Sequence, residues 1–417
     1  MAAEAANPRS LLLHPEFRTL WVAQLVSVFG DFLLLFGVVS LITFHLHRTP
    51  SDVAFAIASF LLPLSLLAPF AGVLVDRWNV KRVMIASDLT RAAIAASFIF
   101  VRDVQQIDLG MALLGLFSSF FGPAHSVALR VLIPPADLLA ANALLAQAFY
   151  AVRILSPAIA GALVAALSEK ACFWADAASF VFSAAMIGRL TISRPPVAGQ
   201  ESSLRALGRD FVEGNRFIFT HRGLSLAFLA SAAAMFMLSS FSPLISVYVR
   251  DTLHARELVY GGISSMVGVG LIVGAQGIRR LAKDAPIAPV VLGGLFGLGI
   301  GAVLLGSFRN VVAAGLSTLI IGGAIAVVVL PAQTLTQKDT PPTMMGRVSS
   351  TFMSLFSVSQ VLGLLLSGAL ATRLGIRPLF LLCGATLVVL SGAGWLWLRS
   401  RPISSVFPPS REHAEKA

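Results

Sequence analysis

The chain has 417 residues, of which 57% are hydrophobic and only 12% are charged. A soluble domain would carry about twice that share of charged residues, so the composition excludes a soluble protein. The net charge of +11 does not indicate nucleic-acid binding, because the basic residues lie in short segments between apolar runs, where membrane-insertion topology accounts for them. Both cysteines, Cys172 and Cys383, lie in apolar runs and indicate neither a disulfide framework nor a metal site.

Apolar runs of about 20 residues recur along the whole chain, which is the length that crosses a bilayer as a helix. They predict an all-α membrane protein with twelve transmembrane helices. Residues 1–15 are short and polar, and no cleavable signal peptide is expected. The predicted spans are 17–44, 53–75, 80–100, 109–129, 138–167, 172–190, 224–249, 260–277, 287–308, 311–331, 347–372 and 378–398.

The distribution of Lys and Arg predicts the orientation of these spans. Most of the 31 basic residues fall in the segments that share a side with both termini. Because cytoplasmic loops carry an excess of Lys and Arg, both termini are expected in the cytoplasm, in a multi-pass protein of the cell membrane.

The longest loop, residues 191–223, lies midway and is the predicted boundary between two bundles. We expect an N-terminal six-helix bundle at 1–190, this linker, a C-terminal six-helix bundle at 224–400 and a cytoplasmic tail at 401–417. The second part of the linker alternates apolar and charged residues, which predicts an amphipathic helix lying on the inner leaflet. Its apolar positions are Leu204, Leu207, Phe211, Phe217 and Ile218, and its charged positions are Arg205, Arg209, Asp210, Glu213 and Arg216.

An internal repeat supports the two bundles. A Pro-Ala pair, a Pro-Pro pair and a Gly-Ala-Leu triplet occur once in each half, at an offset of about 207 residues. Duplicated six-span halves with a site near the membrane midplane are a transporter architecture. The first copies begin at Pro123, Pro134 and Gly161, and the second copies begin at Pro331, Pro341 and Gly368.

A charge cluster separates the second predicted span from the third. It comprises Asp76, Arg77, Lys81 and Arg82, and Gly72 precedes it. Gly72 is expected to permit close packing, and Asn79 is expected to accommodate a left-handed turn. The simpler interpretation is a membrane hairpin whose basic residues anchor it to the cytoplasmic face. The position after the second of twelve spans favours a functional loop instead.

Charged residues inside spans are costly and are usually functional. Asp31 lies in the middle of the first predicted span, and Arg153 lies in the fifth. Asp88 and Arg91 are three residues apart on the third span and share a helix face. A carboxylate in apolar surroundings can exchange protons near neutral pH, so Asp31 is a candidate for proton or substrate coupling.

The alternative is that Asp31 makes a structural hydrogen bond or an ion pair, with Arg153 as a candidate partner. Asp88 and Arg91 are expected to form a structural pair, with a coupling role as the alternative. The other candidates for a substrate cavity are sparse polar and aromatic residues within spans. They are Gln24, Gln147, Gln276, Gln360, Trp21, Phe29 and Phe32.

The charge cluster resembles the loop signature of major facilitator transporters, G-x-x-x-D-R-x-G-K/R-K/R, with Asn79 for the second Gly and Val80 for a base. With the segment Pro123-Ala124-His125-Ser126, Arg130 and the segment around Asn142, the chain looks like a bacterial major facilitator exporter of the enterobactin-exporter and macrolide-efflux branch. Residues 153–161 partly resemble an antiporter motif. This resemblance implies two six-helix bundles, alternating access, and export of a small amphipathic or siderophore-like molecule driven by proton entry into the cell.

The resemblance also implies a cytoplasmic gate. In the family, the acid that matches Asp76 caps the N-terminal end of the eleventh helix, here near Gly346 and Arg347. A helix N-terminus carries partial positive charge and attracts an acid. Arg130, at the inner end of the fourth span, is expected to complete this gate.

Three alternatives remain open at this stage. An importer of nutrients and a lipid or lysophospholipid flippase share the same predicted fold, and the flippase also tolerates an apolar lining. A polytopic membrane enzyme is disfavoured, because the seven His residues are scattered and mostly lie in loops. No phosphate-binding Gly-Lys-Ser/Thr loop occurs, so ATP-driven transport is not expected. We expect a monomer in the lipid bilayer that needs no cofactor.

Overall fold

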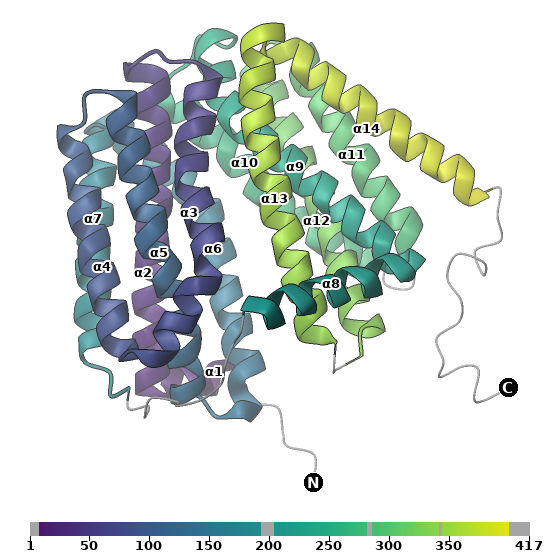
Figure 1. The fold of residues 1–417 in the computed structure, drawn as a ribbon. Helices are drawn as coiled ribbons and strands as arrows, with labels where there is room; N and C mark the ends of the chain where they lie inside the picture. The colour runs from purple at the N-terminus through teal and green to yellow at the C-terminus, as the bar shows by residue number, and fades with distance from the viewer. Residues whose placement is uncertain (1–7, 193–203, 282–285, 342–343, 400–417) are drawn as a thin grey trace, which may run out of the picture. The chain divides into compact units, whose positions relative to one another are not determined.

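The computed structural model describes residues 8–192, 204–281, 286–341 and 344–399, and these residues form helices joined by short connections (Figure 1). Twelve of the helices are long and apolar enough to cross a membrane, which confirms the predicted number of spans. The predicted tail at 401–417 lies outside the described residues. The first six spanning helices are α2 (Pro15–Ser40), α3 (Pro50–Arg77), α4 (Val80–Ser97), α5 (Val104–Leu132), α6 (Leu138–Ala166) and α7 (Glu169–Gly188).

The second set of spanning helices repeats the first at a constant interval. Each of these helices begins 207 residues after its counterpart, which is the offset found in the repeated sequence motifs. The structure therefore extends the repeat from three short motifs to all six helix pairs. The second set comprises α9 (Arg222–Asp251), α10 (Glu257–Leu281), α11 (Ile287–Ser307), α12 (Val311–Asp339), α13 (Met345–Leu374) and α14 (Ile376–Arg399).

The chain divides into two compact units. Unit 1 comprises Met1–Glu201 together with Ile245–Ser265, and unit 2 comprises Ser202–Leu244 and Met266–Ala417. The division therefore cuts through α9 just after Pro243, which lies inside that helix. A proline in a helix interior removes a backbone hydrogen bond and permits a bend, so α9 can pass from one unit to the other at this residue.

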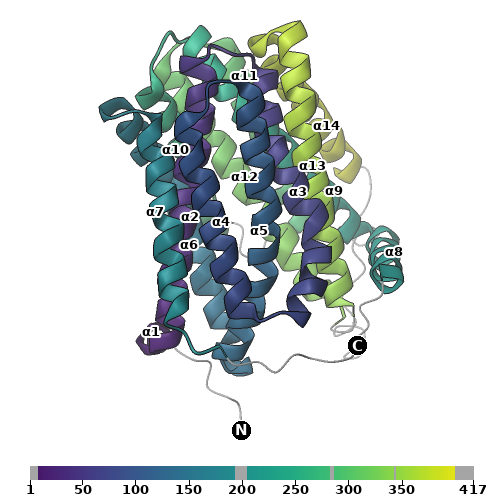
Figure 2. The same cartoon turned by 60° about the vertical axis from the view of Figure 1, so that its left-hand side comes forward.

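Unit 1 is built around α2. This helix packs against α6 and α7, while α4 packs against α5 and α7, and α3 packs against α5 (Figure 2). Large apolar side chains such as Phe17, Leu20 and Met84 fill the core at one end of these helices and have 1% of their surface exposed or less.

In unit 2, α11 packs between α12 and α14. The linker contains a helix, α8 (Leu204–Thr220), which lies against the N-terminal end of α13 (Figure 1). Its contact with the inner leaflet stays a prediction. Ile218 of α8 is fully buried, in a cluster that includes Phe228 and Val348. The linker helix is thus a packed part of unit 2.

The turn between α3 and α4 differs from the expectation at two residues. Asn79 adopts an extended conformation, with φ −70° and ψ 109°, and its side chain accepts a hydrogen bond from the backbone N–H of Arg82. Asn79 is therefore the N-cap of α4, and the expected left-handed turn is wrong. A Cβ atom at Gly72 would lie 4.0 Å from the Cβ of Pro123, which is ordinary contact, so close packing does not require glycine there.

Candidate functional site

Three acids and one base lie together inside unit 1, and we call them the carboxylate cluster. It comprises Asp31 of α2, Asp88 and Arg91 of α4, and Asp176 of α7. Asp88 is fully buried, while Asp176 and Arg91 are 1% and 3% exposed. Each of the three acids is near enough to Arg91 for their charges to interact. A charged group costs several kcal/mol to bury without a partner, so this concentration of acids is exceptional.

Arg91 is held by one acid and two aromatic rings. Its guanidinium forms an ion pair with Asp88 one turn away on the same helix, which confirms the predicted pair. The guanidinium carbon also lies 4.5 Å from the centre of the Phe121 ring and 4.2 Å from that of Phe180. Cation–π contacts of this kind stabilise a buried cation. Arg91 is therefore fixed beside Asp88.

The remaining acids are less completely satisfied. The hydroxyl of Ser179 donates to the backbone carbonyl oxygen of Asp176 at 2.8 Å and lies 3.3 Å from Oδ1 of the same residue, whereas Oδ2 of Asp176 has no hydrogen-bond partner in the structure. Oδ2 of Asp88 has no partner within hydrogen-bond distance, but the hydroxyl of Ser183 is near enough to interact with this carboxylate. Nε of Arg91 and the hydroxyl of Ser183 are also buried without a hydrogen-bond partner, so the cluster contains unpaired donors as well as unpaired acceptors. Buried polar atoms are normally paired, and unpaired ones point to a functional role.

Asp176 lies in the sixth predicted span but is not among the charged residues for which the sequence predicted a role. A signal for it was present. Asp176, Ser179 and Ser183 are spaced three and four residues apart, which places polar side chains on one helix face in an apolar span. All three are buried, with 6% exposure or less.

The other cavity candidates lie on α2, on α6 and in unit 2. No ion pair joins Asp31 to Arg153 among the described residues, and the base that acts on Asp31 is Arg91. Arg153 is half-buried on α6, Gln147 of the same helix is exposed, and Gln360 belongs to unit 2. The amide oxygen of Gln24 is buried without a hydrogen-bond partner in the structure. A role for these four residues in substrate binding stays a prediction.

The predicted gate residues of unit 1 lie at the ends of helices. Gly72 and Arg77 belong to the last turns of α3, and Lys81 and Arg82 belong to the first turn of α4. The ammonium of Lys81 donates to the carbonyl oxygen of Gly188 at 2.7 Å, so it caps the C-terminus of α7. Arg77 and Arg82 are exposed.

The gate predictions for Asp76 and Gly346 cannot be compared with the structure, because the surroundings of these two residues lie outside the part that the structure describes. Arg130 is exposed, and its Nε donates to the carbonyl oxygen of Ser126 on its own helix at 3.3 Å. These contacts neither support nor contradict a gate.

Arg347, the remaining gate candidate, has a partner that the sequence analysis did not assign. Its Nη1 atom lies 2.6 Å from Oε2 of Glu213 on α8. Beside this pair, a Cβ atom at Gly214 would lie 2.7 Å from the carbonyl oxygen of Arg347, so only glycine permits the two helices to approach so closely. Arg347 therefore joins the linker helix to the start of α13.

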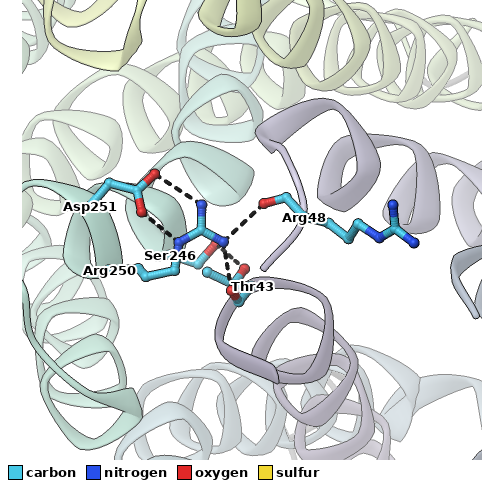
Figure 3. Close-up of polar contacts among 5 residues, drawn as sticks. All are labelled: Thr43, Arg48, Ser246, Arg250 and Asp251. Atoms are coloured by element: carbon cyan, nitrogen blue, oxygen red, sulfur yellow. Dashed lines mark hydrogen bonds and ion pairs between the residues drawn. The ribbon is translucent and has the colours of Figure 1, made fainter. Parts of the chain in front are cut away.

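A second polar cluster in unit 1 lies where α2 ends, and we call it the Arg250 clamp. Arg250, at the end of α9, donates from Nη1 to the carbonyl oxygens of Thr43 and Arg48, at 2.6 and 3.0 Å (Figure 3). Its other nitrogens bind the neighbouring Asp251 at 2.6 and 2.9 Å. The hydroxyl of Thr43 lies 3.0 Å from that of Ser246. Arg250 thus binds the carbonyl of Thr43, at the C-terminal end of the first spanning segment, and that of Arg48 in the connection that follows.

Within the described residues, no three His, Cys, Asp or Glu side chains are placed to hold a metal ion. Twelve spanning helices in two repeated sets, with ionisable groups buried inside the first set, define a polytopic membrane transporter. The model of the Major Facilitator Superfamily matches residues 20–361, and the chain belongs to that family.

Relatives across nearly the whole chain agree with this assignment. An uncharacterised MFS-type transporter, YfiS of Bacillus subtilis, is 28% identical over 89% of this chain and 90% of its own. Macrolide efflux protein A of Streptococcus pyogenes is 27% identical over 90% of this chain and 94% of its own. The lysophospholipid transporter LplT of Escherichia coli is 24% identical over 95% of this chain and 99% of its own.

Among solved structures, that of the nucleoside transporter NupG resembles the fold with a TM-score of 0.72 and covers 92% of this chain and 99% of its own. Its sequence identity is 13%, so this likeness concerns the fold alone. The fold and the relatives are those of bacterial multi-pass membrane transporters for small molecules and not those of enzymes.

Proposed function

We propose that this protein exports a small amphipathic molecule from the cell in exchange for protons. The observation that carries the proposal is the carboxylate cluster. Ionisable groups buried in a membrane bundle are expensive, and transporters use them to carry protons. Asp31, in the middle of the first spanning helix, is the candidate whose protonation couples to substrate movement.

The comparison of the two repeated helix sets supports a functional role for the carboxylate cluster over a role in folding. At the offset of 207 residues, the positions of Asp31, Asp88, Arg91 and Asp176 correspond to Leu238, Leu295, Leu298 and Cys383. The second set of helices therefore uses apolar or weakly polar residues at the same places. Because a bundle of this design folds without the charges, their retention in the first set favours a chemical role.

The names of the relatives support the direction and the substrate class. Macrolide efflux protein A is named for export of a macrolide, a bulky amphipathic molecule. A panel of macrolides, other drugs and siderophores, applied to a strain lacking the transporter and to the complemented strain, tests the proposal. We expect lower accumulation of at least one compound in the complemented strain, and loss of that difference when a protonophore is added. Unchanged accumulation of every compound would contradict export of this class.

Coupling is tested in membrane vesicles that carry a pH gradient. The substrate found in the panel should dissipate the gradient with the natural protein and fail to do so with Asp31→Asn. Asp108→Asn is the control, because Asp108 lies within a spanning helix of unit 1, has a buried oxygen without a hydrogen-bond partner, and is not a member of the carboxylate cluster. Equal coupling in Asp31→Asn and in the natural protein would mean that a residue other than Asp31 couples proton movement to substrate movement.

A lysophospholipid flippase is the second candidate, because a relative is named as a lysophospholipid transporter. Uptake of a fluorescent lysophospholipid by spheroplasts distinguishes it from drug export. Protein-dependent uptake without drug export would favour this second function.

A further inference from the structure

The contact between α2 and α7 brings a second acid to Asp31. A Cβ atom at Gly30 would collide with the hydroxyl of Ser179 and with Oδ1 of Asp176, so the backbone of α2 lies directly against these two side chains. Asp31 follows Gly30 and is near enough to Asp176 for their charges to interact. Asp176 therefore lies beside the proposed coupling residue.

Among the groups that act on these two acids in the described part of the chain, the base is Arg91, and both acids share it with Asp88. Arg91 is bound to Asp88 on its own helix turn and held between two rings. The charged groups that act on Asp176 from the neighbouring helices are Asp31, Arg91 and Asp88. Asp176 is buried and Asp31 is half-buried. Two neighbouring acids in such a site cannot both be ionised at low cost, and a single proton held between them removes the repulsion.

The buried face of α7 continues from Asp176 toward the N-terminal start of the helix. Cys172 and Glu169 lie one and two turns before Asp176, and both are buried. Glu169 is about 10 Å from Asp176 along the helix axis. Oε2 of Glu169 lies 3.4 Å from Nδ1 of His45, whose side chain is 51% exposed. Polar groups on this face thus lead from a half-exposed histidine to the cluster.

We infer that Asp176 is a second proton-binding carboxylate of this transporter, and that Asp31 and Asp176 hold one proton between them. The inference rests on the proposed proton antiport for its role in transport. The shared proton itself is a property of the resting protein and can be tested without a substrate.

Infrared difference spectroscopy of the protein in lipid vesicles detects protonated carboxyl groups directly. The variants are made in an Asp108→Asn background, which removes another carboxyl group of the same unit. We expect a protonated carboxyl band that shifts in Asp176→Asn, shifts in Asp31→Asn and is lost only in the double variant. A band that Asp176→Asn leaves unchanged, or no such band in the parent, would overturn the inference.

Asparagine has nearly the shape of aspartate, and Asp176→Cys provides a second replacement if that variant does not fold. The equivalent residue of the second set is Cys383, and it lies within helix α14. A cysteine at this position is therefore compatible with a helix. It should also shift the carboxyl band, and an unchanged band in folded Asp176→Cys would overturn the inference.

The two proposals fail in different ways. Vesicle transport of the substrate found in the panel, driven by a pH gradient, should fall at least tenfold in Asp176→Asn, while exchange without a gradient continues. A shifted band with unaltered gradient-driven transport would keep the shared proton and contradict the proposed coupling. An unshifted band with lost transport would contradict the shared proton and leave the antiport proposal standing on Asp31.

Discussion

Arg250 binds the carbonyl oxygen of Thr43 at 2.6 Å, and the two residues are 207 positions apart, which is the interval of the repeat. Equivalent positions of the first helices of the two sets therefore contact each other. The same region contains a second contact, between the rings of Phe36 and Tyr260, whose centres are 4.7 Å apart. These contacts explain why residues 245–265 group with unit 1 although they belong to the second set of helices.

Loss of the Arg250 guanidinium should loosen the end of α2. Arg250→Ala removes a charged donor to two carbonyl groups, and each hydrogen bond to a charged group contributes about 1.5–3 kcal/mol. We expect faster amide hydrogen exchange at residues 41–48 and 245–253. Arg250→Lys should recover only part of the protection, because an ammonium cannot reproduce the planar fork that binds the carbonyls and Asp251 together.

Arg256→Ala is the matched control for this experiment. Arg256 is an exposed arginine of the next connection. Its replacement should leave exchange at residues 41–48 unaltered. Equal protection in Arg250→Ala and in the natural protein would mean that the clamp does not hold the end of α2.

Gly30→Ala should separate α2 from α7. The added methyl group collides with Ser179 and Asp176, and overpacking of this kind costs about 1–3 kcal/mol. Gly122→Ala on α5 is the control, because nothing lies within 4 Å of a Cβ atom there and alanine favours the helix by about 1 kcal/mol. Thermal unfolding in detergent should give a lower melting temperature for Gly30→Ala and an equal or higher one for Gly122→Ala. The opposite order of melting temperatures would contradict the close contact of α2 with α7.

The pair formed by Glu213 and Arg347 should fix the linker helix on α13. Its side chains are 42% and 34% exposed, so solvent screening limits the coupling to about 0.5–1 kcal/mol. Either single charge reversal should increase proteolytic cleavage in α8, and the double reversal should restore part of the resistance. Arg216→Glu, which reverses an exposed charge on the same helix, is the control. Additive effects of the two reversals would show that the ion pair does not couple the helices.

Local patterns in the sequence predict the spans, the linker helix and the pair of Asp88 and Arg91, because each depends on residues within a few turns of one another. The surroundings of Asp176 depend on α2 and α4, which are distant in the sequence. The apolar patterns of the spans do not say which helix faces meet, so neither the contact with Gly30 nor the neighbouring Arg91 could be predicted. The extended conformation of Asn79 was missed for a different reason, since asparagine suits both a left-handed turn and an N-cap.

Asp76 provides a test of the predicted cytoplasmic gate. The family resemblance assigns to this acid a role at the N-terminal end of the eleventh spanning helix, α13, where an anion is favoured by the helix dipole. Asp76→Asn should therefore abolish transport while membrane insertion, measured by the amount of protein in the membrane fraction, stays unchanged. Asp137→Asn is the control, because Asp137 precedes α6 and its side chain makes no cap hydrogen bond. Normal efflux by Asp76→Asn would contradict the predicted gate. Equal losses of transport in both variants would indicate a general effect of charge at this surface.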